Sequence, residues 1–348
     1  ILYALDISDP DAPEMLWRID PSSTGFAELG QTWSVPVVTR IPGYADNEGV
    51  PKPVLVFGAG YDTNKDSSGL PTADAMGRGV FIVDAATGAL VWSMTPHANS
   101  ASNLQEVGLV HSVAAGVTTL DSNGDTLTDR IYFADTGGQV WRIDLPGAAL
   151  PDSSQNTWRA VKLAAVNGGT LATDRRFFNA PDVVRTSYAG AAFDAILIGS
   201  GDRTNPNEMD DPNDPNKPAA DNQFYMFRDR AINPYFTEAP TSSDCNATPP
   251  SVDFRCQLPL DPNDLYDATS NIIQTGTADQ KAAAQAALAA SKGWRLDLQA
   301  DPDPASGNPL ARSGEKALAR AITIGGNVYF TTFTPEPSDT QTCNPVPG

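Results

Sequence analysis

Apolar and polar positions alternate over many short stretches of the chain, which is the period of half-buried β-strands. One unit recurs: an apolar run ending in Asp, a turn containing Gly, and a second apolar run containing Trp. It spans 80–92 and 131–143, and a looser copy with a longer turn spans 2–17. Alternation and turn chemistry make each unit a predicted hairpin. We expect Asp to end the first strand, Gly to adopt a positive φ, and Trp to pack on the next layer.

Further strand-like segments accompany these hairpins, in units of about four strands. They are 34–39, 54–58, 112–119, 130–134, 182–186, 195–199, 224–227, 318–324 and 328–333. Four-stranded units that recur along a chain are typical of a β-propeller, so the predicted fold class is all-β. We count about four units, with broken ones at both ends, and expect 1–348 to be a single propeller domain truncated at both ends. The first residues also resemble the middle of a strand.

One predicted helix interrupts the strands. Thr277 and Gln280 have the spacing of a capping box ahead of the Ala-rich stretch 281–290, and Gly293 is placed to end the helix. The stretch contains few large apolar residues, so we expect it on the surface. The polar insertion 201–222 offers little to bury and is expected to be a mobile loop.

Composition narrows the classes of function. The 348 residues carry 42 acids against 23 bases, a formal charge of −19, with 41% hydrophobic residues. This is a globular composition, and such a charge disfavours binding to nucleic acid or anionic lipid, which need basic patches. No apolar run approaches the roughly 18 residues of a membrane helix, so membrane insertion is not expected.

The chain has three cysteines, of which Cys245 and Cys256 share one Pro- and Ser-rich loop. We predict that they form a disulfide, which implies an oxidising compartment. The alternative is a pair of reduced thiols in the cytoplasm. Cys343 lies near the end of the sequence, and its partner is left open.

The segment 121–129 carries the main candidate site. Oxygen-bearing side chains occupy its positions 1, 3, 5 and 9, and position 7 can offer a backbone carbonyl. Calcium takes six to eight oxygen ligands in forgiving geometry, whereas magnesium keeps its waters and requires a stricter octahedron. The sequence therefore predicts a Ca²⁺ site between two strands. Its ligands are Asp121, Asn123, Asp125, Leu127 through its carbonyl, and Asp129.

This loop departs from the EF-hand pattern. Position 6 is Thr126 where an EF-hand has Gly, position 12 is Tyr132 where it has Glu, and the flanks are predicted strands. It is closer to the shorter Asp-x-Asn-x-Asp-x-x-x-Asp loops of β-propellers. The alternative is an ordinary Asn-Gly-Asp turn with solvated acids.

Two weaker echoes of the pattern occur elsewhere. The first has acceptors at positions 1, 3 and 5, no acid at position 9, and a lysine among them; the second is a cluster of acids in the polar insertion. The residues are Asp62, Asn64 and Asp66 with Lys65, and then Asp210, Asp211 and Asp214. Both can equally be solvated loops.

Several motifs together resemble one family. They are Tyr61-Asp62-Thr63-Asn64, the hairpin 81–92, the loop 121–129 running into Arg130-Ile131-Tyr132, the segment 134–144, Gly199-Ser200-Gly201-Asp202-Arg203, Phe224-Tyr225 with Arg228-Asp229-Arg230, and Gly293-Trp294 with Gly314-Glu315-Lys316. The sequence resembles the C-terminal propeller domain of the PilY/PilC family, the type IV pilus tip-associated adhesins and biogenesis factors. The matching blocks are spread over nearly the whole chain.

The resemblance implies a modified quinoprotein-like propeller with one Ca²⁺ in the loop 121–129. It implies that calcium regulates pilus extension against retraction, and hence twitching motility, surface attachment and virulence. The implied partners are minor pilins of the pilus tip and host or abiotic surfaces. The implied location is the cell surface at the pilus tip, after export through the periplasm and outer membrane. No enzymatic activity is implied.

Two other functions remain open. The Asp-Gly-Trp hairpins also resemble the blades of pyrroloquinoline-quinone-dependent dehydrogenases, although the chain has no adjacent cysteines. A metal-independent scaffold for minor pilins is the second alternative. Neither His97 nor His111 stands in the context of a Ser or Cys nucleophile, so we expect both to be structural or exposed.

Overall fold

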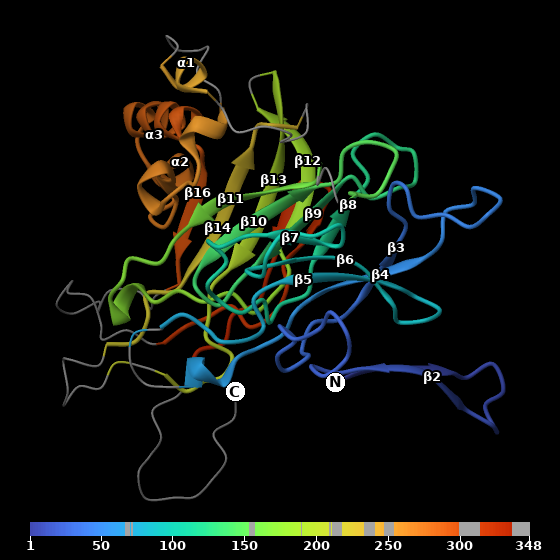
Figure 1. The fold of residues 1–348 in the computed structure, drawn as a ribbon. Coiled ribbons are helices and arrows are strands. Elements are labelled where there is room, and N and C mark those ends of the chain that lie inside the picture. The colour runs from blue at the N-terminus through green and yellow to red at the C-terminus, as the bar shows by residue number, and fades with distance from the viewer. Residues whose placement is uncertain are drawn as a thin grey trace, which may run out of the picture.

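The computed structural model describes most of the chain. The ranges described are 1–66, 70, 72–152, 157–188, 190–208, 210, 218–232, 241–246, 254–298 and 314–335. They are mostly β with few helices, as predicted (Figure 1). No sheet among these residues closes on itself, and the propeller arrangement stays a prediction.

The described strands form five sheets in chain order: a two-stranded hairpin, three sheets of four or five strands, and a second two-stranded hairpin. The first hairpin pairs β1 (Leu2–Asp6) with β2 (Glu14–Ile19). The second sheet runs in the order β3 (Val37–Thr39), β4 (Val54–Gly58), β5 (Val80–Asp84), β6 (Leu90–Thr95) and β7 (Asn103–Gln105). Its strands are antiparallel except for β7, which runs parallel to β6.

The third sheet is an antiparallel meander. It consists of β8 (Thr118–Leu120), β9 (Arg130–Ala134), β10 (Gln139–Asp144) and β11 (Arg159–Ala165). The fourth sheet runs in the order β12 (Asp182–Tyr188), β13 (Ala191–Gly199), β14 (Gln223–Asp229), β16 (Gly293–Asp297) and β15 (Tyr266–Asp267). The last hairpin pairs β17 (Ile322–Ile324) with β18 (Asn327–Tyr329) through Gly325 and Gly326, as predicted but with shorter strands.

The first strands of successive sheets lie next to one another. Contacts join β3 to β8, β8 to β12, and β12 to β17, and Figure 1 shows β12, β8 and β3 one after another along the same side. Each pair of successive sheets also shares a hydrophobic core. One core combines Val56 and Trp92 with Phe133 and Trp141, and corresponding clusters lie between the other neighbouring sheets. The sheets are therefore packed in sequence order.

The repeated hairpins have the predicted chemistry. Asp84 accepts hydrogen bonds from the backbone amides of Ala86 and Thr87, and Asp135 accepts them from Gly137 and Gln139. Gly88 and Gly138 have φ values of 71° and 73°, which glycine adopts without strain. The tryptophans of both hairpins, Trp92 and Trp141, are fully buried. Asp thus caps the turn and Trp fills the layer between sheets.

The α-helices lie at one end of the sheets, near β16, whereas the short 3-10 helices near the start and the middle of the chain lie elsewhere (Figure 1). The α-helices are α1 (Ser242–Cys245), α2 (Ile272–Thr275) and α3 (Ala278–Ala290), and the 3-10 helices are η1 (Thr63–Asp66), η2 (Leu171–Thr173), η3 (Phe254–Gln257) and η4 (Pro262–Asp264). The capping box of Thr277 and Gln280 begins α3, and Ala284 is its one buried residue, so the predicted surface helix is confirmed. Ser291 caps its end, whereas Gly293, expected there, begins β16.

Two other expectations about local structure need correction. The strand expected over 112–119 is reduced to β8, because Ser112 and Val113 donate their backbone amides to Asp74 and Gly77 instead of a ladder partner. In the insertion 201–222, the described part is tied down: Arg176 pairs with Asp202 at 2.9 Å, and Ala219 and Ala220 are buried. Residues 209 and 211–217 lie outside the described part.

Candidate functional site

The loop 121–129 connects β8 to β9 and lies at the end of these strands (Figure 1). Its base is fixed by the fold. The Asp129 amide donates to the Leu120 carbonyl, and the Thr128 amide donates to the Arg40 carbonyl. The Thr128 hydroxyl lies 2.7 Å from that of Thr39 on β3. Asp129 is 2% exposed, whereas Asp121, Asn123 and Asp125 are exposed. The loop is therefore an exposed turn on a buried base.

Asp121 organises the turn from its first position. One carboxylate oxygen accepts the Gly124 amide at 2.6 Å, and the other accepts the Thr126 amide at 2.8 Å. Partial burial by itself raises the pKa of Asp121, but these backbone hydrogen bonds outweigh it and lower the pKa overall. The carboxylate is thus held ionised inside the loop.

Thr126 has φ of +73°, a left-handed conformation that is uncommon for a β-branched residue. It stands at position 6, where EF-hand loops need Gly for a sharp turn. The absence of Gly at this position was a departure from the EF-hand in sequence, yet the backbone makes the same left-handed turn. Strain at such a residue persists only where the surroundings enforce it, and it concentrates at functional sites.

The remaining oxygen-bearing side chains of the loop turn toward one another. The Asn123 amide nitrogen lies 3.2 Å from Asp125 and 3.3 Å from Asp129. The second oxygen of Asp129 accepts from both the amide and the hydroxyl of Ser122, each at 2.7 Å. Asp125 accepts the Leu127 amide at 2.8 Å. A donor thus stands between two carboxylates, where a cation would also be stabilised.

The residue types of this loop are those that Ca²⁺ prefers, since its four predicted ligand side chains carry oxygen. The side chains are not gathered around one point, however, since no group of three or more His, Cys, Asp or Glu that could hold a metal occurs in the described ranges. The four predicted side chains and Leu127 are therefore neighbours in one turn, and calcium ligation by them stays a prediction.

The weaker echo at Asp62 is differently built. Asp62 accepts the amides of Asn64, Ala75 and Met76, and Asp66 accepts the Tyr61 hydroxyl. These carboxylates are used in separate structural contacts. In the other acidic cluster, Asp210 accepts the Ala219 amide at 2.8 Å, while Asp211 and Asp214 lie outside the described residues, as does Cys343.

Lys65 belongs to a buried polar cluster that sequence reasoning missed. Its ammonium group lies 3.2 Å from Asp74 and 2.8 Å from Nδ1 of His111. Burial, and then the charge of Lys65, lower the pKa of His111 to about 4, so its imidazole is neutral at pH 7. His111 is thus structural, as predicted, and His97 is mostly exposed beside Glu28.

A larger buried ion network, also missed, joins the third and fourth sheets. Arg142 lies 2.6 Å from Asp144 and 2.7 Å from Asp229, and Arg130 lies 2.9 Å from Asp194. The Tyr132 hydroxyl lies 3.1 Å from both Asp194 and Asp229. Arg185 extends the network to the loop, since it pairs with Asp194 at 2.8 Å and donates to the Ser122 carbonyl at 3.5 Å. The one signal in sequence is alternation in β10, which puts Arg142 and Asp144 on the same face.

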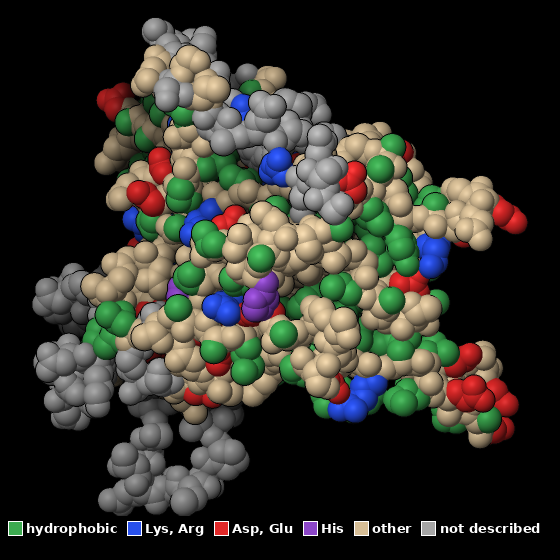
Figure 2. All heavy atoms as spheres, viewed as in Figure 1, with side chains coloured by type: hydrophobic (Ala, Val, Ile, Leu, Met, Phe, Trp, Pro, Cys, Tyr) green, Lys and Arg blue, Asp and Glu red, His purple; other side chains and the backbone are tan. Residues whose placement is uncertain are grey.

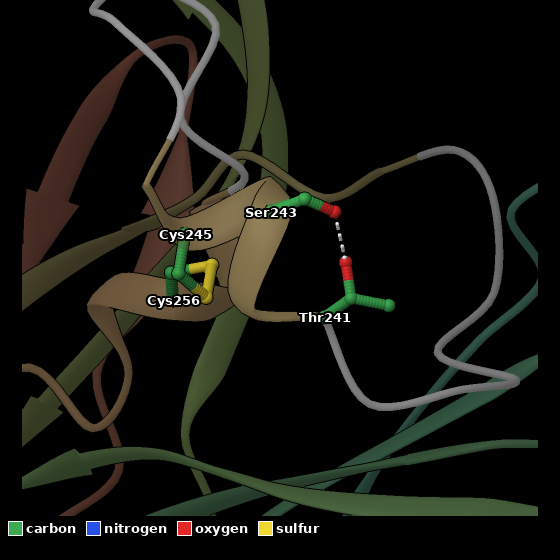
Figure 3. Close-up of a disulfide and its surroundings, with 4 residues drawn as sticks. All are labelled: Thr241, Ser243, Cys245 and Cys256. Atoms are coloured by element: carbon green, nitrogen blue, oxygen red, sulfur yellow. Dashed lines mark hydrogen bonds between the residues drawn. A yellow bond between two sulfur atoms is a disulfide. The ribbon is translucent and has the colours of Figure 1, made fainter.

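The predicted disulfide is formed. Cys245 in α1 and Cys256 in η3 are joined, with their Cα atoms 5.3 Å apart (Figure 3). Figure 3 also shows the hydrogen bond between the hydroxyls of Thr241 and Ser243, 2.7 Å long, at the start of the same helix. The disulfide links the two short helices at the top of the fourth sheet.

Fold and loop together define a class: a mostly β protein of successively packed sheets with an acidic Asp-x-Asn-x-Asp-type turn. No protein-family model matches the chain. In sequence, 154 residues are 30% identical to the type IV pilus biogenesis factor PilY1 of Pseudomonas aeruginosa strain UCBPP-PA14, covering 43% of this chain and 11% of that protein. A PilY1 homolog of Xylella fastidiosa is 26% identical over 156 residues, 42% of this chain and 9% of the homolog.

The crystal structure of the P. aeruginosa PilY1 C-terminal domain has the same fold. It matches 96% of this chain and 62% of its own chain, with a TM-score of 0.58 and 18% identity. The predicted resemblance to the PilY/PilC family is thereby confirmed, in sequence by the match to PilY1 and in fold by the match to its C-terminal domain. The matched stretches span about a tenth of the length of the curated relatives. Among the described helices, none combines the length and apolarity needed to cross a bilayer.

Proposed function

We propose that this domain acts in type IV pilus biogenesis and that calcium in the loop 121–129 regulates it. The observation that carries the proposal is the joint likeness to PilY1 in sequence and to its C-terminal domain in fold. The proposed location is the pilus tip at the cell surface, reached by export through the periplasm and outer membrane. The proposed partners are minor pilins and the host or abiotic surfaces to which a pilus attaches.

The arrangement of the sheets supports a propeller. We propose that the sheets beginning with β3, β8, β12 and β17 are consecutive blades of a modified quinoprotein-like propeller, with these first strands nearest the axis. In support, each first strand contacts the next, and each pair of successive sheets shares a core. A crystal structure in which the first strands do not surround one axis would overturn this arrangement.

The proposed metal ligands are Asp121, Asn123, Asp125 and Asp129 by their side chains and Leu127 by its carbonyl. A bound calcium ion supplies positive charge that neutralises the loop carboxylates. Asp121 pre-forms the turn through the amides of Gly124 and Thr126. Asp129 is the member built into the base, since its backbone joins the loop to Leu120 and Leu145. Fixing the conformation of the loop would therefore also fix the end of β8, to which Asp129 is hydrogen-bonded, and the start of β9, which follows Asp129 directly.

Isothermal titration calorimetry with Ca²⁺ tests the metal site. We expect saturable binding in the wild type and the largest loss in Asp129→Ala, because this carboxylate can supply two oxygens. Glu48→Ala, which removes an exposed acid from another loop, is the matched control and should bind as the wild type does. Equal Ca²⁺ affinity in Asp129→Ala and wild type would contradict the assignment of Asp129 as a calcium ligand. Anomalous scattering from a calcium-soaked crystal would locate the ion directly.

A twitching assay tests the biological role. The full-length protein carrying Asp125→Ala should be exported normally and should alter pilus extension or retraction at physiological calcium. If piliation and twitching are unchanged when Asp125 and Asp129 are both replaced by Ala, the domain is a metal-independent scaffold for minor pilins and calcium regulation is wrong.

We also propose that the domain has no enzymatic activity. The test adds pyrroloquinoline quinone and calcium to the purified protein and follows dye reduction with a panel of alcohols. Turnover above that of the heat-denatured control would establish the dehydrogenase alternative instead.

A further inference from the structure

A cavity of about 320 Å³ lies where the chain enters the first strands of several sheets. Trp33 and Val35 precede β3, Gly116 and Val117 precede β8, and Phe178 precedes β12. Cavities of this size are at the lower end of those that hold small ligands. Its position at the convergence of β3, β8, β12 and β17 does not involve the loop 121–129.

Two aromatic residues, Trp33 and Phe178, line the cavity, and Tyr61 packs against both of them. The Trp33 ring stacks on Tyr61, with centroids 4.3 Å apart and planes inclined by 11°, and Phe178 lies 6.3 Å from Trp33. Tyr61 and Phe178 are buried, but Trp33 is 43% exposed and Val35 is 77% exposed. Exposed aromatic and branched side chains around a concave site are typical of ligand sites, because an apolar ligand gains free energy by covering them.

Two arginines give the cavity its charge. Arg203 and Arg320 are the charged residues that line it in the described part of the chain, and no Asp or Glu lines it there. Arg203 is exposed and makes no ion pair within the described residues. Arg320 is 49% exposed, and its nearest acid is Asp182 at 3.8 Å. The chain has a net charge of −19, so two guanidinium groups beside one apolar cavity make this place locally positive on an acidic protein.

Arginine is suited to carboxylates because its planar fork matches the two oxygens. Arg320 is held in orientation by Thr118, whose hydroxyl lies 3.2 Å from its guanidinium, and by the carbonyl of Pro181 at 3.4 Å. Its remaining N–H groups can therefore serve a ligand at little cost in ordering.

We propose that this cavity binds a small apolar carboxylate, with the apolar group on the Trp33 face and the carboxylate between Arg203 and Arg320. Two sources have this chemistry: a free aromatic or aliphatic acid, and the C-terminal residue of a peptide chain. The inference goes beyond the proposed role of calcium, and either can hold without the other.

Matched probes test the proposal. N-acetylphenylalanine carries the carboxylate, N-acetylphenylalaninamide lacks it, and the peptide acetyl-Ala-Ala-Phe presents it at a chain end. We expect the acid to bind at least about tenfold more tightly than the amide, which is the worth of one charged hydrogen bond. Calorimetry or ligand-observed NMR at low salt gives the affinities, and added salt should weaken the acid alone.

Variants locate the site. Arg203→Gln and Arg320→Gln should each remove most of the preference for the acid, whereas Arg18→Gln, an exposed arginine on β2, should retain it. Gly116→Leu should abolish binding of all probes by filling the cavity. A Cβ there meets only Ala180 and the Val35 carbonyl, both at 3.7 Å, so the fold should tolerate the change. Circular dichroism and melting temperature check that each variant is folded.

The outcomes decide the proposal and the source. Tighter binding of the peptide than of N-acetylphenylalanine supports a chain end, and the reverse supports a free acid. Equal affinity for acid and amide, absence of saturable binding to wild type, or unchanged binding in folded Gly116→Leu would each overturn the proposal. Calcium affinity should be the same in all these variants, which separates this result from the test of the loop.

Discussion

Two neighbouring regions of this protein stabilise their aspartates in different ways. Between the third and fourth sheets, Asp144, Asp194 and Asp229 are fully buried and are bound by Arg130 and Arg142. In the loop 121–129, the acids accept backbone amides and the Asn123 amide instead. Within the described residues, neither Asp121 nor Asp125 forms an ion pair with Lys or Arg.

The difference has a physical cause. Removing the partner of a buried carboxylate destabilises a protein by about 3–5 kcal/mol, because an unpaired charge is left in the interior. The buried aspartates are therefore paired with arginines. An exposed carboxylate is solvated by water, so it needs no protein cation and can bind a cation from solution. The network therefore fixes how two sheets are joined, whereas the loop keeps its charge available for a ligand. The side chain of Arg185 contacts both regions, since it pairs with Asp194 and donates to the Ser122 carbonyl.

The largest effect should come from breaking the interior network. Arg142→Ala leaves Asp144 and Asp229 buried without their main cation, and we expect a loss of about 3–5 kcal/mol in the free energy of unfolding. Although burial alone lowers the pKa of Arg142, Asp229 and Asp144 raise it overall, so the arginine is charged at any accessible pH. Urea unfolding measures the loss. The surface variant Arg18→Ala should cost less than about 1 kcal/mol; a similar loss in both would contradict the comparison.

Calcium should stabilise the loop region by a smaller amount. At about a hundredfold excess over its Kd, a ligand that binds only the folded state adds about 2.7 kcal/mol. Unfolding curves with calcium and with chelator should differ by this amount in wild type and coincide in Asp129→Ala. In Arg142→Ala, any folded population should retain the calcium increment, because the loop ligands are unchanged. Loss of the increment there would mean that the two regions act as one unit.

The dependence of stability on pH adds a further test in the buried interior, through His111. Burial, and then Lys65, lower its folded pKa from 6.5 to about 4, so its contribution to stability is present above pH 6.5 and is lost as pH falls toward 4. The slope is at most about 1.4 kcal/mol per pH unit for one proton. His111→Gln should remove this dependence. Comparing the two curves isolates His111, because Asp135, whose burial raises its pKa to about 7, contributes the opposite slope in both.

The smallest effect concerns the backbone of the loop. Thr126 at φ of +73° carries a left-handed conformation that costs an L-residue about 1–2 kcal/mol. Thr126→Gly should therefore stabilise the metal-free protein by up to about 1 kcal/mol, after the greater flexibility of unfolded Gly is subtracted. Thermal unfolding in chelator measures it. Gly124→Ala, at φ of +84° in the same loop, should do the reverse. Destabilisation by Thr126→Gly would show that this conformation is not strained.

Local features were predictable because their partners are close in sequence. The hairpin at 131–144, the capping box of Thr277 and Gln280, and the bond between Cys245 and Cys256 all follow from spacing and turn chemistry. The acidic turn at 121–129, between two strands, was equally predictable from the sequence. Calcium ligation by this loop stays a prediction. The left-handed conformation of Thr126 could not be predicted, since no local rule places a β-branched residue there.

By itself, the sequence determined a mostly β fold with Asp-Gly-Trp hairpins, one capped surface helix, a disulfide and an acidic turn between two strands. Only the tertiary structure decided which buried charges meet, as with Arg142 and Asp229, which are 87 residues apart. It also brought Trp33, Phe178 and Arg320 around one cavity. The physical reason is that strand pattern and turn chemistry act within a few residues, whereas burial and ion pairing depend on how separate sheets pack.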